Sequence, residues 1–464
     1  MGMSFWWLGH ATTTTARVCV RGTTNGAVSV AVAGGATFTG TVDTAVNDGV
    51  VAIDLTGLAP FTSYPITITD ASGATEAGAC KTLPTSGGKV AFISCDERVR
   101  SLTDLAQNII ALGAQAVCHE GDYVYVAANL TNYNQETSPA INTASTVANY
   151  AVHWRQAKRK QDKRLLESTL PHYFMFDDHE FGGDNWDHSV KLAQTSLNVA
   201  SGSIDTGGLG LNGSAEVDAS WWAARQAAAY YMAGNPASDA ALSAEKPPGA
   251  QAGTSVNQYP VCYYRFTVGD MEIFHIDCFS YRSFLATTDN ASKTMLGTIQ
   301  KAWLKARLLA SSATFKVIAS GKTTYKATSG GTGDDWNVYS TERDELIDYI
   351  NANSIKGTVW MCGDAHGAFV SYDPAKGHIA VCANPAGVDH IVQATGHQPF
   401  TIWKESAYTP TAATDARKAG LFGLCEVITA ASGVKTLLLR LIDQYGVELW
   451  RGYVDQSTNV LRTA

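Results

Sequence analysis

Four short apolar segments of the sequence each end in side chains that can bind a metal ion or transfer a proton. These endings lie at residues 92–97, 117–123, 173–180 and 359–366, and together they supply a thiol, a phenol, imidazoles and several carboxylates. One Asp after a strand is usually a turn or cap residue. Because the carboxyl ends of strands in an α/β sheet meet at one crevice, four such endings predict a single shared site.

This mixture of ligand types predicts a centre with one soft or redox-type metal and one hard metal. Two ions together can clamp a phosphoryl group, lower the pKa of a bound water and stabilise the attacking and leaving oxygens. The pattern therefore favours hydrolysis by a metal-activated hydroxide at a dinuclear or larger centre.

Single members of these clusters have plainer interpretations. Cys95, taken alone, is typical of a buried thiol. Tyr125 lies between two valines in a strand-like segment and can equally be a core aromatic. Within residues 177–180, Asp177 or Glu180 can take the place of Asp178 as a ligand, because a sequence does not orient neighbouring side chains.

The elements that must position these residues follow from residue 89 onward, where apolar segments alternate with amphipathic ones. Strands are expected at 89–93, 115–119, 172–176, 315–320 and 357–361, helices at 101–114, 148–169, 298–312 and 340–354, and a hairpin around residues 269–270. A β-rich tail is expected to complete a sheet. Two long stretches, 126–147 and 182–218, interrupt this order and are expected to cover an active site or to be mobile.

Residues 14–83 have a different residue pattern, with short alternating apolar and polar runs rich in Thr, Val, Ala and Gly. This all-β pattern and the linker that follows predict a small immunoglobulin- or fibronectin-like sandwich, used for packing or interaction. We expect a boundary near residue 87, which divides the chain into domains 1–87 and 88–464.

The bulk properties exclude few functions. The chain has 464 residues, 45% of them hydrophobic, and a net charge of -8, which argues against nucleic-acid or anionic-membrane binding. No stretch is apolar enough to span a membrane and the start does not resemble a signal peptide, so the chain as given is expected to be soluble, in a compartment left open. Nine scattered cysteines are expected to be mostly buried. The oligomeric state stays open.

Residues 321–323 are similar to the end of a phosphate-binding loop, but Lys316 stands where the first glycine of that loop is required. A serine-esterase interpretation is also weakened, because the sequence has no G-x-S-x-G nucleophile elbow.

Taken as an ordered set, four motifs resemble the PhoD-like alkaline phosphatase family, within the calcineurin-like metallophosphoesterase superfamily. The motifs are Ser94-Cys95, Gly121-Asp122-Tyr123-Val124-Tyr125, Asp177-Asp178-His179-Glu180 and Gly363-Asp364-Ala365-His366. The resemblance spans nearly the whole chain. It implies an α/β metallophosphoesterase-like β-sandwich flanked by helices, preceded by the small all-β domain.

The resemblance also implies roles for single residues. Cys95 and Tyr125 correspond to thiolate and phenolate ligands of a ferric ion (Fe3+), Asp122 to a bridging carboxylate, and His366 to the residue that completes this first site. Mn2+ or Zn2+ are alternative metals. Asp96 stands where the family commonly has glutamine, which makes the pocket more acidic and bears on substrate choice.

Further roles concern the second site and the substrate. Asp178 and Asp364 correspond to ligands of a hard ion, for which the family suggests calcium (Ca2+). His179 is then left for catalysis, as an acid or electrostatic stabiliser at the leaving oxygen. Arg282 is the substrate-binding candidate, although Phe279 replaces the arginine of the family's usual Asp-x-Arg pattern.

The resulting prediction is an enzyme that hydrolyses phosphoric esters, as an alkaline phosphatase or phosphodiesterase. Mono- and diester preference stays undecided, and a phospholipase D-like phosphodiesterase is the alternative. A different class is a non-catalytic binding or adhesion protein with a degenerate hydrolase domain. Intact ligand clusters argue against that class.

Overall fold

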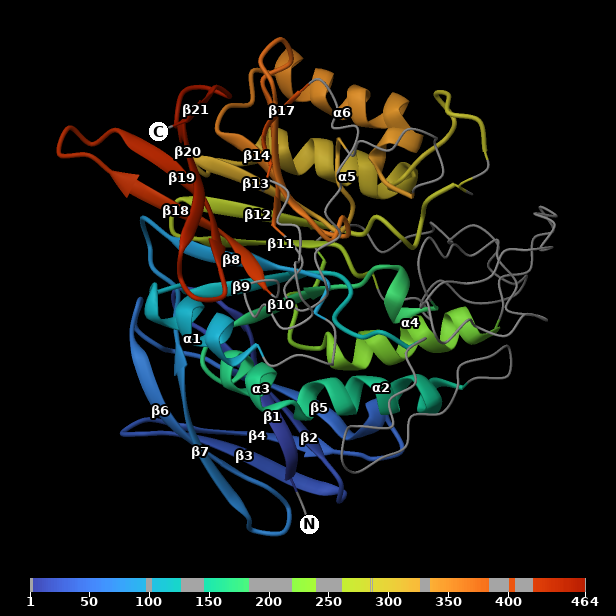
Figure 1. The fold of residues 1–464 in the computed structure, drawn as a ribbon. Helices are drawn as coiled ribbons and strands as arrows, with labels where there is room; N and C mark the ends of the chain where they lie inside the picture. Colours follow the sequence, from blue (N-terminus) through green and yellow to red (C-terminus); the bar gives the residue numbers. More distant parts are fainter. Residues whose placement is uncertain are drawn as a thin grey trace, which may run out of the picture.

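The computed structural model describes residues 3–96, 102–126, 146–182, 219–238, 261–325 apart from 284 and 286, 334–383, 400–404 and 420–463. Figure 1 shows two large sheets in the middle of the molecule, with the N-terminal strands on one side and α5 and α6 on the other. Among the described residues, no helix is long and apolar enough to cross a membrane.

The N-terminal strands form two small antiparallel sheets. One contains β1 Met3–Ala11, β2 Ala16–Gly22 and β5 Val50–Leu55, and the other contains β4 Thr37–Val42, β3 Gly26–Val32, β6 Ser63–Thr69 and β7 Thr75–Lys81. Alternating apolar side chains from both sheets, Leu8, Val18, Val30 and Ile66 among them, pack into one cluster. The expected strands are therefore present. The immunoglobulin- or fibronectin-like identity and the boundary at residue 87 stay predictions.

The first large sheet is made of seven strands. In spatial order they are β10 His172–Met175, β9 Ala116–Glu120, β8 Lys89–Ile93, β18 Leu421–Thr429, β19 Lys435–Asp443, β20 Glu448–Asp455 and β21 Leu461–Thr463. β8, β9 and β10 run parallel, whereas β18 pairs antiparallel with β8. The chain's tail thus completes this sheet, as its alternating pattern predicts.

The second large sheet also has seven strands. Their order is β11 Tyr264–Val268, β12 Met271–Ile276, β13 Phe315–Ser320, β14 Thr358–Cys362, β16 His378–Ala383, β15 Ala368–Asp373 and β17 Thr401–Lys404. β12, β13, β14 and β16 are parallel. The expected hairpin is confirmed, because β11 and β12 pair antiparallel with Val268 opposite Met271.

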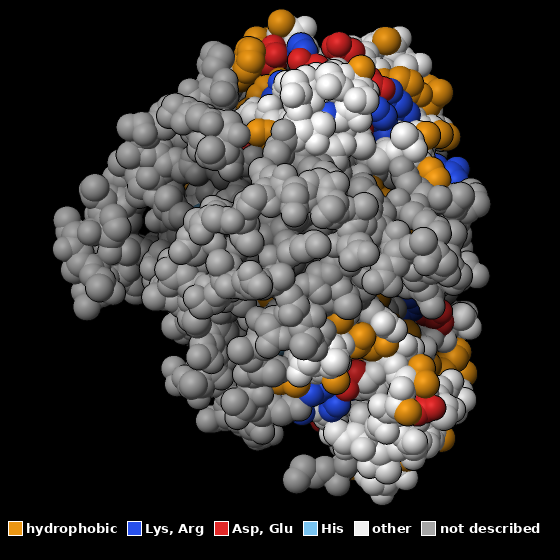
Figure 2. All heavy atoms as spheres, turned by 90° about the vertical axis from the view of Figure 1, so that its right-hand side faces the viewer, with side chains coloured by type: hydrophobic (Ala, Val, Ile, Leu, Met, Phe, Trp, Pro, Cys, Tyr) orange, Lys and Arg blue, Asp and Glu red, His pale blue; other side chains and the backbone are white. Residues whose placement is uncertain are grey.

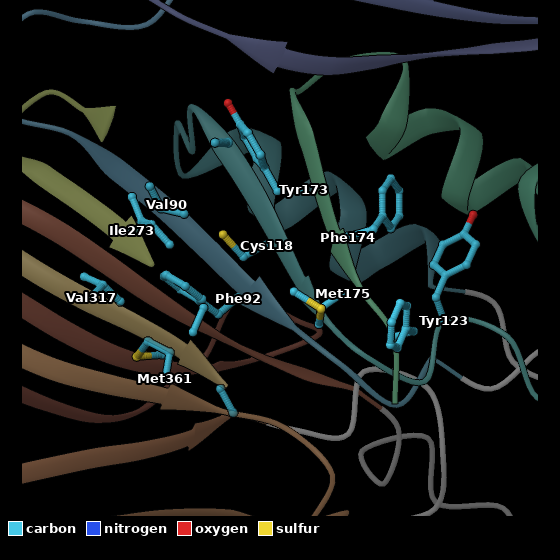
Figure 3. Close-up of a cluster of buried hydrophobic side chains, with 14 of the residues drawn as sticks. Val90, Phe92, Cys118, Tyr123, Tyr173, Phe174, Met175, Ile273, Val317 and Met361 are labelled. Carbon is cyan, nitrogen blue, oxygen red and sulfur yellow. The ribbon is translucent and has the colours of Figure 1, made fainter. Parts of the chain in front are cut away.

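The core lies between the two large sheets. Figure 3 shows Val90 and Phe92 of β8 near Ile273, Val317 and Met361 of the second sheet, and all five belong to one buried cluster. Strands covered on both faces are nearly continuous in apolar residues. Such strands have little freedom to slip, so their carboxyl ends are held at fixed positions.

Helices cover the outer faces. α1 Thr103–Ala111 and α3 Gln161–Glu167 pack on the first sheet, and α2 Val147–Arg159 packs on α4 Ala219–Tyr231. α5 Gly297–Ala310 and α6 Ser340–Ala352 cover the second sheet. Short 3-10 turns lie at Asn47–Gly49, Asp178–Glu180 and Trp336–Tyr339. The arrangement is the expected α/β sandwich of two large sheets with flanking helices.

One expected helix is wrong in extent. The segment 148–169 is predicted as a single helix, but it divides into α2 and α3 at Lys160, whose backbone leaves the helical region with ψ 129°. The break turns α3 so that the Asp162 carboxylate accepts a hydrogen bond from the Leu102 N–H at the start of α1. The helical periodicity of the sequence does not predict this break, because the break depends on a tertiary contact.

Other expectations concern the cysteines and the long interruptions. All nine cysteines are buried and none of these described side chains forms a disulfide. Most of residues 126–147 and 182–218 lie outside the described residues, so their role as a cover stays a prediction. On the face shown in Figure 2, the described surface mixes acidic, basic and apolar side chains.

Candidate metal centre

The carboxyl ends of strands from both sheets approach so closely that two glycines are required. A Cβ on Gly121, whose φ is +102°, would lie 2.6 Å from the Cβ of Asp177. A Cβ on Gly363 would lie 3.0 Å from the carbonyl oxygens of Glu120 and Gly321. These contacts bring the ends of β9, β10, β13 and β14 together, as the strand-end pattern predicts.

Four of the predicted ligands have an unusual backbone. Cys95, Asp122, Asp364 and His366 have φ of 53°, 58°, 70° and 49°, and they make up half of the eight non-glycine residues with positive φ among the described residues. This region costs free energy for residues with a Cβ and persists where the surroundings impose it. The strain turns four side chains, from the ends of β8, β9 and β14, toward one place.

The first set of ligand atoms is compact. The Cys95 Sγ lies 3.5 Å from Asp122 Oδ2, and the Tyr125 Oη lies 3.3 Å from the same oxygen and 3.5 Å from His366 Nε2. Ligand atoms of Cys95, Asp122 and His366 all lie within 4.8 Å of one another. Thiol, phenol, carboxylate and imidazole thus surround one point.

The electrostatics of this set fit a bound cation. Burial, followed by the Asp122 charge, raises the pKa of the Cys95 thiol and of the Tyr125 phenol well above their ordinary values. The Oδ1 atom of Asp122 is buried without a hydrogen-bond partner among the described residues. A metal ion supplies the positive charge that lets such groups ionise. Cys95, Tyr125, Asp122 and His366 are therefore suited to hold one.

Two more groups of possible ligands adjoin the first. One contains Asp122, Asp178 and His179, and the other contains Asp177, Asp178 and Asp364. The His179 ring lies 4.1 Å from the Tyr125 ring, centroid to centroid. Asp122 and Asp178 each belong to two of the three groups, so these two carboxylates connect them.

Glu180, the open alternative within its motif, has a different position. Its carboxylate accepts hydrogen bonds from the backbone N–H groups of Asp122, Tyr123, Val124 and Asp177, at 3.1, 2.5, 3.0 and 2.7 Å. It therefore ties the turn after β9 to the turn after β10. The sequence pattern identifies Glu180 as a member of the motif, but it does not predict these backbone hydrogen bonds.

Lys322 is the residue that the sequence analysis missed. Its Nζ lies 2.7 Å from Asp334, 2.8 Å from Asp364, 2.9 Å from Asp177 and 3.7 Å from Asp178, with the side chain fully buried. Burial lowers its pKa, but the four carboxylates outweigh that effect and raise the pKa well above its ordinary value. The signal was present, because Lys322 follows strand β13 as closely as the other ligands follow theirs.

Arg282 lies beside this lysine. Its Nη1 donates to Asp334 Oδ2 at 3.0 Å, its side chain is fully buried, and its guanidinium lies 4.6 Å from the Phe279 ring centroid. Asp334 thus joins Arg282 to Lys322. Substrate binding by Arg282 stays a prediction.

The comparison with known families bears on this geometry. The sequence profile of the PhoD-like phosphatase family matches residues 90–412, which contain every predicted ligand. The chain belongs to the PhoD-like phosphatase family. This membership agrees with the resemblance given by the four strand-end motifs.

Individual relatives agree with the family. Alkaline phosphatase D of Bacillus subtilis (strain 168) is 24% identical over 353 residues, which cover 69% of this chain and 54% of that protein. The chain thus spans about half the length of this curated relative. A solved structure of PhoD matches with a TM-score of 0.71 and 18% identity, covering 99% of this chain and 91% of that one.

A more distant fold relative is the purple acid phosphatase PPD1 from yellow lupin (Lupinus luteus) seeds. It has a TM-score of 0.59 and 12% identity, over 97% of this chain and 74% of that chain. At these identities the two solved structures establish the fold alone. They support the metallophosphoesterase-like architecture of this PhoD-like chain.

Proposed function

We propose that this PhoD-like chain hydrolyses phosphoric esters, with water attacking phosphorus in line with the leaving oxygen and no covalent enzyme intermediate. The convergence of Cys95, Tyr125, Asp122 and His366 within one family member carries the proposal. A metal ion bound there supplies positive charge that lowers the pKa of water and stabilises phosphoryl oxygens.

The side chains then have distinct tasks. Asp122 belongs to both ligand groups, so it would hold a metal bound beside Cys95 close to Asp178 and His179. His179, which lies against Tyr125, is proposed to protonate or orient the leaving oxygen. Arg282 is proposed to help hold the phosphoryl group, through a guanidinium group that lies beside Asp334.

The metal of the first set is proposed to be ferric iron. A thiolate and a phenolate are ligands that suit a redox-type metal, with Mn2+ or Zn2+ as alternatives that elemental analysis separates. Calcium on Asp178 and Asp364, which the resemblance implies, fits less well. Both carboxylates already have the Lys322 ammonium group as a partner.

We also propose that residues 1–87 form an immunoglobulin- or fibronectin-like packing domain and residues 88–464 the catalytic domain. The separate apolar cluster of the N-terminal strands supports this division. Contacts such as Arg155 with Asp48 support a packing role.

The decisive experiment compares wild type with Cys95→Ala and Asp122→Asn. We expect both variants to lose stoichiometric metal, visible charge-transfer absorption and hydrolysis. The substrates are p-nitrophenyl phosphate, bis-p-nitrophenyl phosphate and phosphatidylcholine, which separate monoesterase, diesterase and phospholipase D-like activity. Cys80→Ala is the matched control, because that buried thiol lies in the N-terminal cluster.

Full activity without stoichiometric metal in both variants would refute the mechanism. A wild-type chain with neither metal nor activity on any ester would instead favour the binding or adhesion class. The panel therefore separates the proposal from both alternatives.

A further inference from the structure

The acidic half of the site contains a positive charge of its own. Lys322 follows β13 directly, and its Nζ lies within 2.9 Å of carboxylate oxygens of Asp177, Asp334 and Asp364. Asp177, Asp178 and Asp364 are also the residues that form one of the three possible metal groups. The ammonium group therefore lies where a cation bound by that group would lie.

Lys322 is held in this place by its backbone. The Ser320 Oγ donates to the Lys322 carbonyl oxygen at 2.7 Å, and the Trp336 Nε1 donates to the same Oγ at 3.2 Å. Both Lys322 and Trp336 are fully buried. The buried lysine side chain thus leaves a backbone that is fixed at the end of the strand.

We infer that the ammonium group of Lys322 is the resident cation of the Asp177, Asp178 and Asp364 group, in place of a hard metal ion. This inference rests on the proposed function, since it concerns the second half of the same site. It departs from the calcium that the family resemblance implies there. The first metal, at Cys95, is unaffected.

Geometry and charge both exclude calcium while the lysine is present. Calcium needs six to eight oxygen ligands at about 2.3–2.6 Å, and the Nζ occupies the space between the same carboxylates. A divalent ion beside the ammonium group would also add like-charge repulsion in a buried place, where screening is weak. Removing the amine should therefore open a calcium site.

The test measures calcium binding with the iron half loaded. Wild type, Lys322→Gln and the double variant K322Q/D177N are titrated with calcium chloride by calorimetry and by thermal shift. We expect no stoichiometric binding and no thermal shift for wild type. For K322Q we expect one calcium ion per chain and a rise in the melting temperature.

The double variant locates the new site. Asp177 belongs to the ligand group around Lys322, which also contains Asp178 and Asp364. It does not belong to the group of Asp122, Asp178 and His179. K322Q/D177N should therefore lose the calcium that K322Q gains. Lys158→Gln is the matched control, because Lys158 is also buried and carboxylate-paired, with Glu167 at 2.8 Å, and it should gain none.

Stoichiometric calcium in purified wild type, or equal stabilisation of wild type and K322Q, would overturn the inference. Should K322Q fail to fold, the wild-type titration decides alone: binding overturns the inference and its absence supports it. Failure of the proposed function would show separately, as missing iron absorption and missing hydrolysis in wild type.

Discussion

His179 combines two chemical possibilities at a single residue. Its ring lies 4.1 Å from that of Tyr125, and its ligand atom lies in one group with Asp122 and Asp178. A metal ligand and a proton donor to the leaving oxygen would respond differently to substitution. The difference can be measured with substrates whose leaving groups differ in basicity.

We predict that His179→Asn retains the bound metal but lowers kcat by about 10²–10⁴-fold for alkyl phosphate esters, the usual contribution of a general acid. The loss should be much smaller for p-nitrophenyl phosphate, because its leaving oxygen needs no proton. Steady-state kinetics across a series of leaving groups measures this. An equal loss for every ester, together with lost metal, would assign His179 to metal binding.

The turns that present the ligands depend on Glu180. Four backbone N–H groups from the turns after β9 and β10 donate to its carboxylate. A buried N–H group without an acceptor costs about 1–3 kcal/mol. The carboxylate therefore stabilises the strained backbone of Asp122, whose φ is 58°.

We predict that Glu180→Ala lowers the free energy of unfolding by about 3 kcal/mol or more, since several buried N–H groups lose their acceptor together. The content of bound metal should fall as well, because Asp122, the proposed ligand, is released. Chemical denaturation and elemental analysis measure the two effects. The control Glu426→Ala removes a partly exposed carboxylate paired with Arg440 and should cost far less. Unchanged metal content in E180A would contradict this role.

Strand β12 carries a buried histidine, His275, that makes stability depend on pH. His275 of β12 is buried, with Nδ1 2.8 Å from the Tyr264 Oη, and that hydroxyl donates to the Phe174 carbonyl oxygen at 2.9 Å. The hydroxyl must therefore accept from Nδ1–H, which leaves the buried Nε2 without a partner among the described residues. Burial accordingly lowers the pKa of His275 to about 3.

We predict that His275 makes the fold less stable in acid. Between its unfolded pKa of about 6.5 and the folded value of about 3, only the unfolded chain gains a proton, so stability falls as pH falls. The loss approaches about 4 kcal/mol at the lower end. Unfolding free energies of wild type and His275→Gln are compared from pH 7 to pH 4. Parallel profiles would rule out this contribution.

Sequence periodicity predicts some of the strands and helices correctly, but it does not predict features that depend on contacts distant in sequence. β8, β13 and the β11–β12 hairpin were predicted because each is a buried apolar run or a pair joined by a tight turn. The break at Lys160 depends on α1, which is distant in sequence. Lys322 was missed for a related reason: it was compared with a phosphate-loop motif, whereas its partners come from three other segments.

At the scale of the whole molecule, the N-terminal strands share a core with the helices beside them. Phe5 and Trp7 belong to the same buried cluster as Trp154 of α2 and Tyr231 of α4. The Trp154 and Tyr231 rings stack with centroids 5.7 Å apart. The N-terminal strands therefore contribute to the stability of the catalytic part, although the ligands lie elsewhere.

The polar part of this junction is centred on Asp48, in the turn before β5. Its carboxylate pairs with Arg155 of α2 at 2.8 Å and Arg21 of β2 at 3.3 Å, and accepts a hydrogen bond from the Tyr231 hydroxyl of α4. The Asp48 side chain is 19% exposed and Arg155 is 9% exposed. Removing the carboxylate leaves two nearly buried guanidinium groups without this partner, which is costly.

We therefore predict that Asp48→Ala lowers the free energy of unfolding by about 2–3 kcal/mol, less than for a fully buried pair because of its partial exposure. Metal content and kcat should be unchanged at temperatures where the variant is folded. Asp54→Ala is the matched control: its pair with Arg17 is also N-terminal but 55% exposed on the carboxylate side, so its cost should stay under about 1 kcal/mol. Equal losses of stability in the two variants would contradict this contribution of Asp48, and lost metal in D48A would show that the N-terminal contact also affects the metal site.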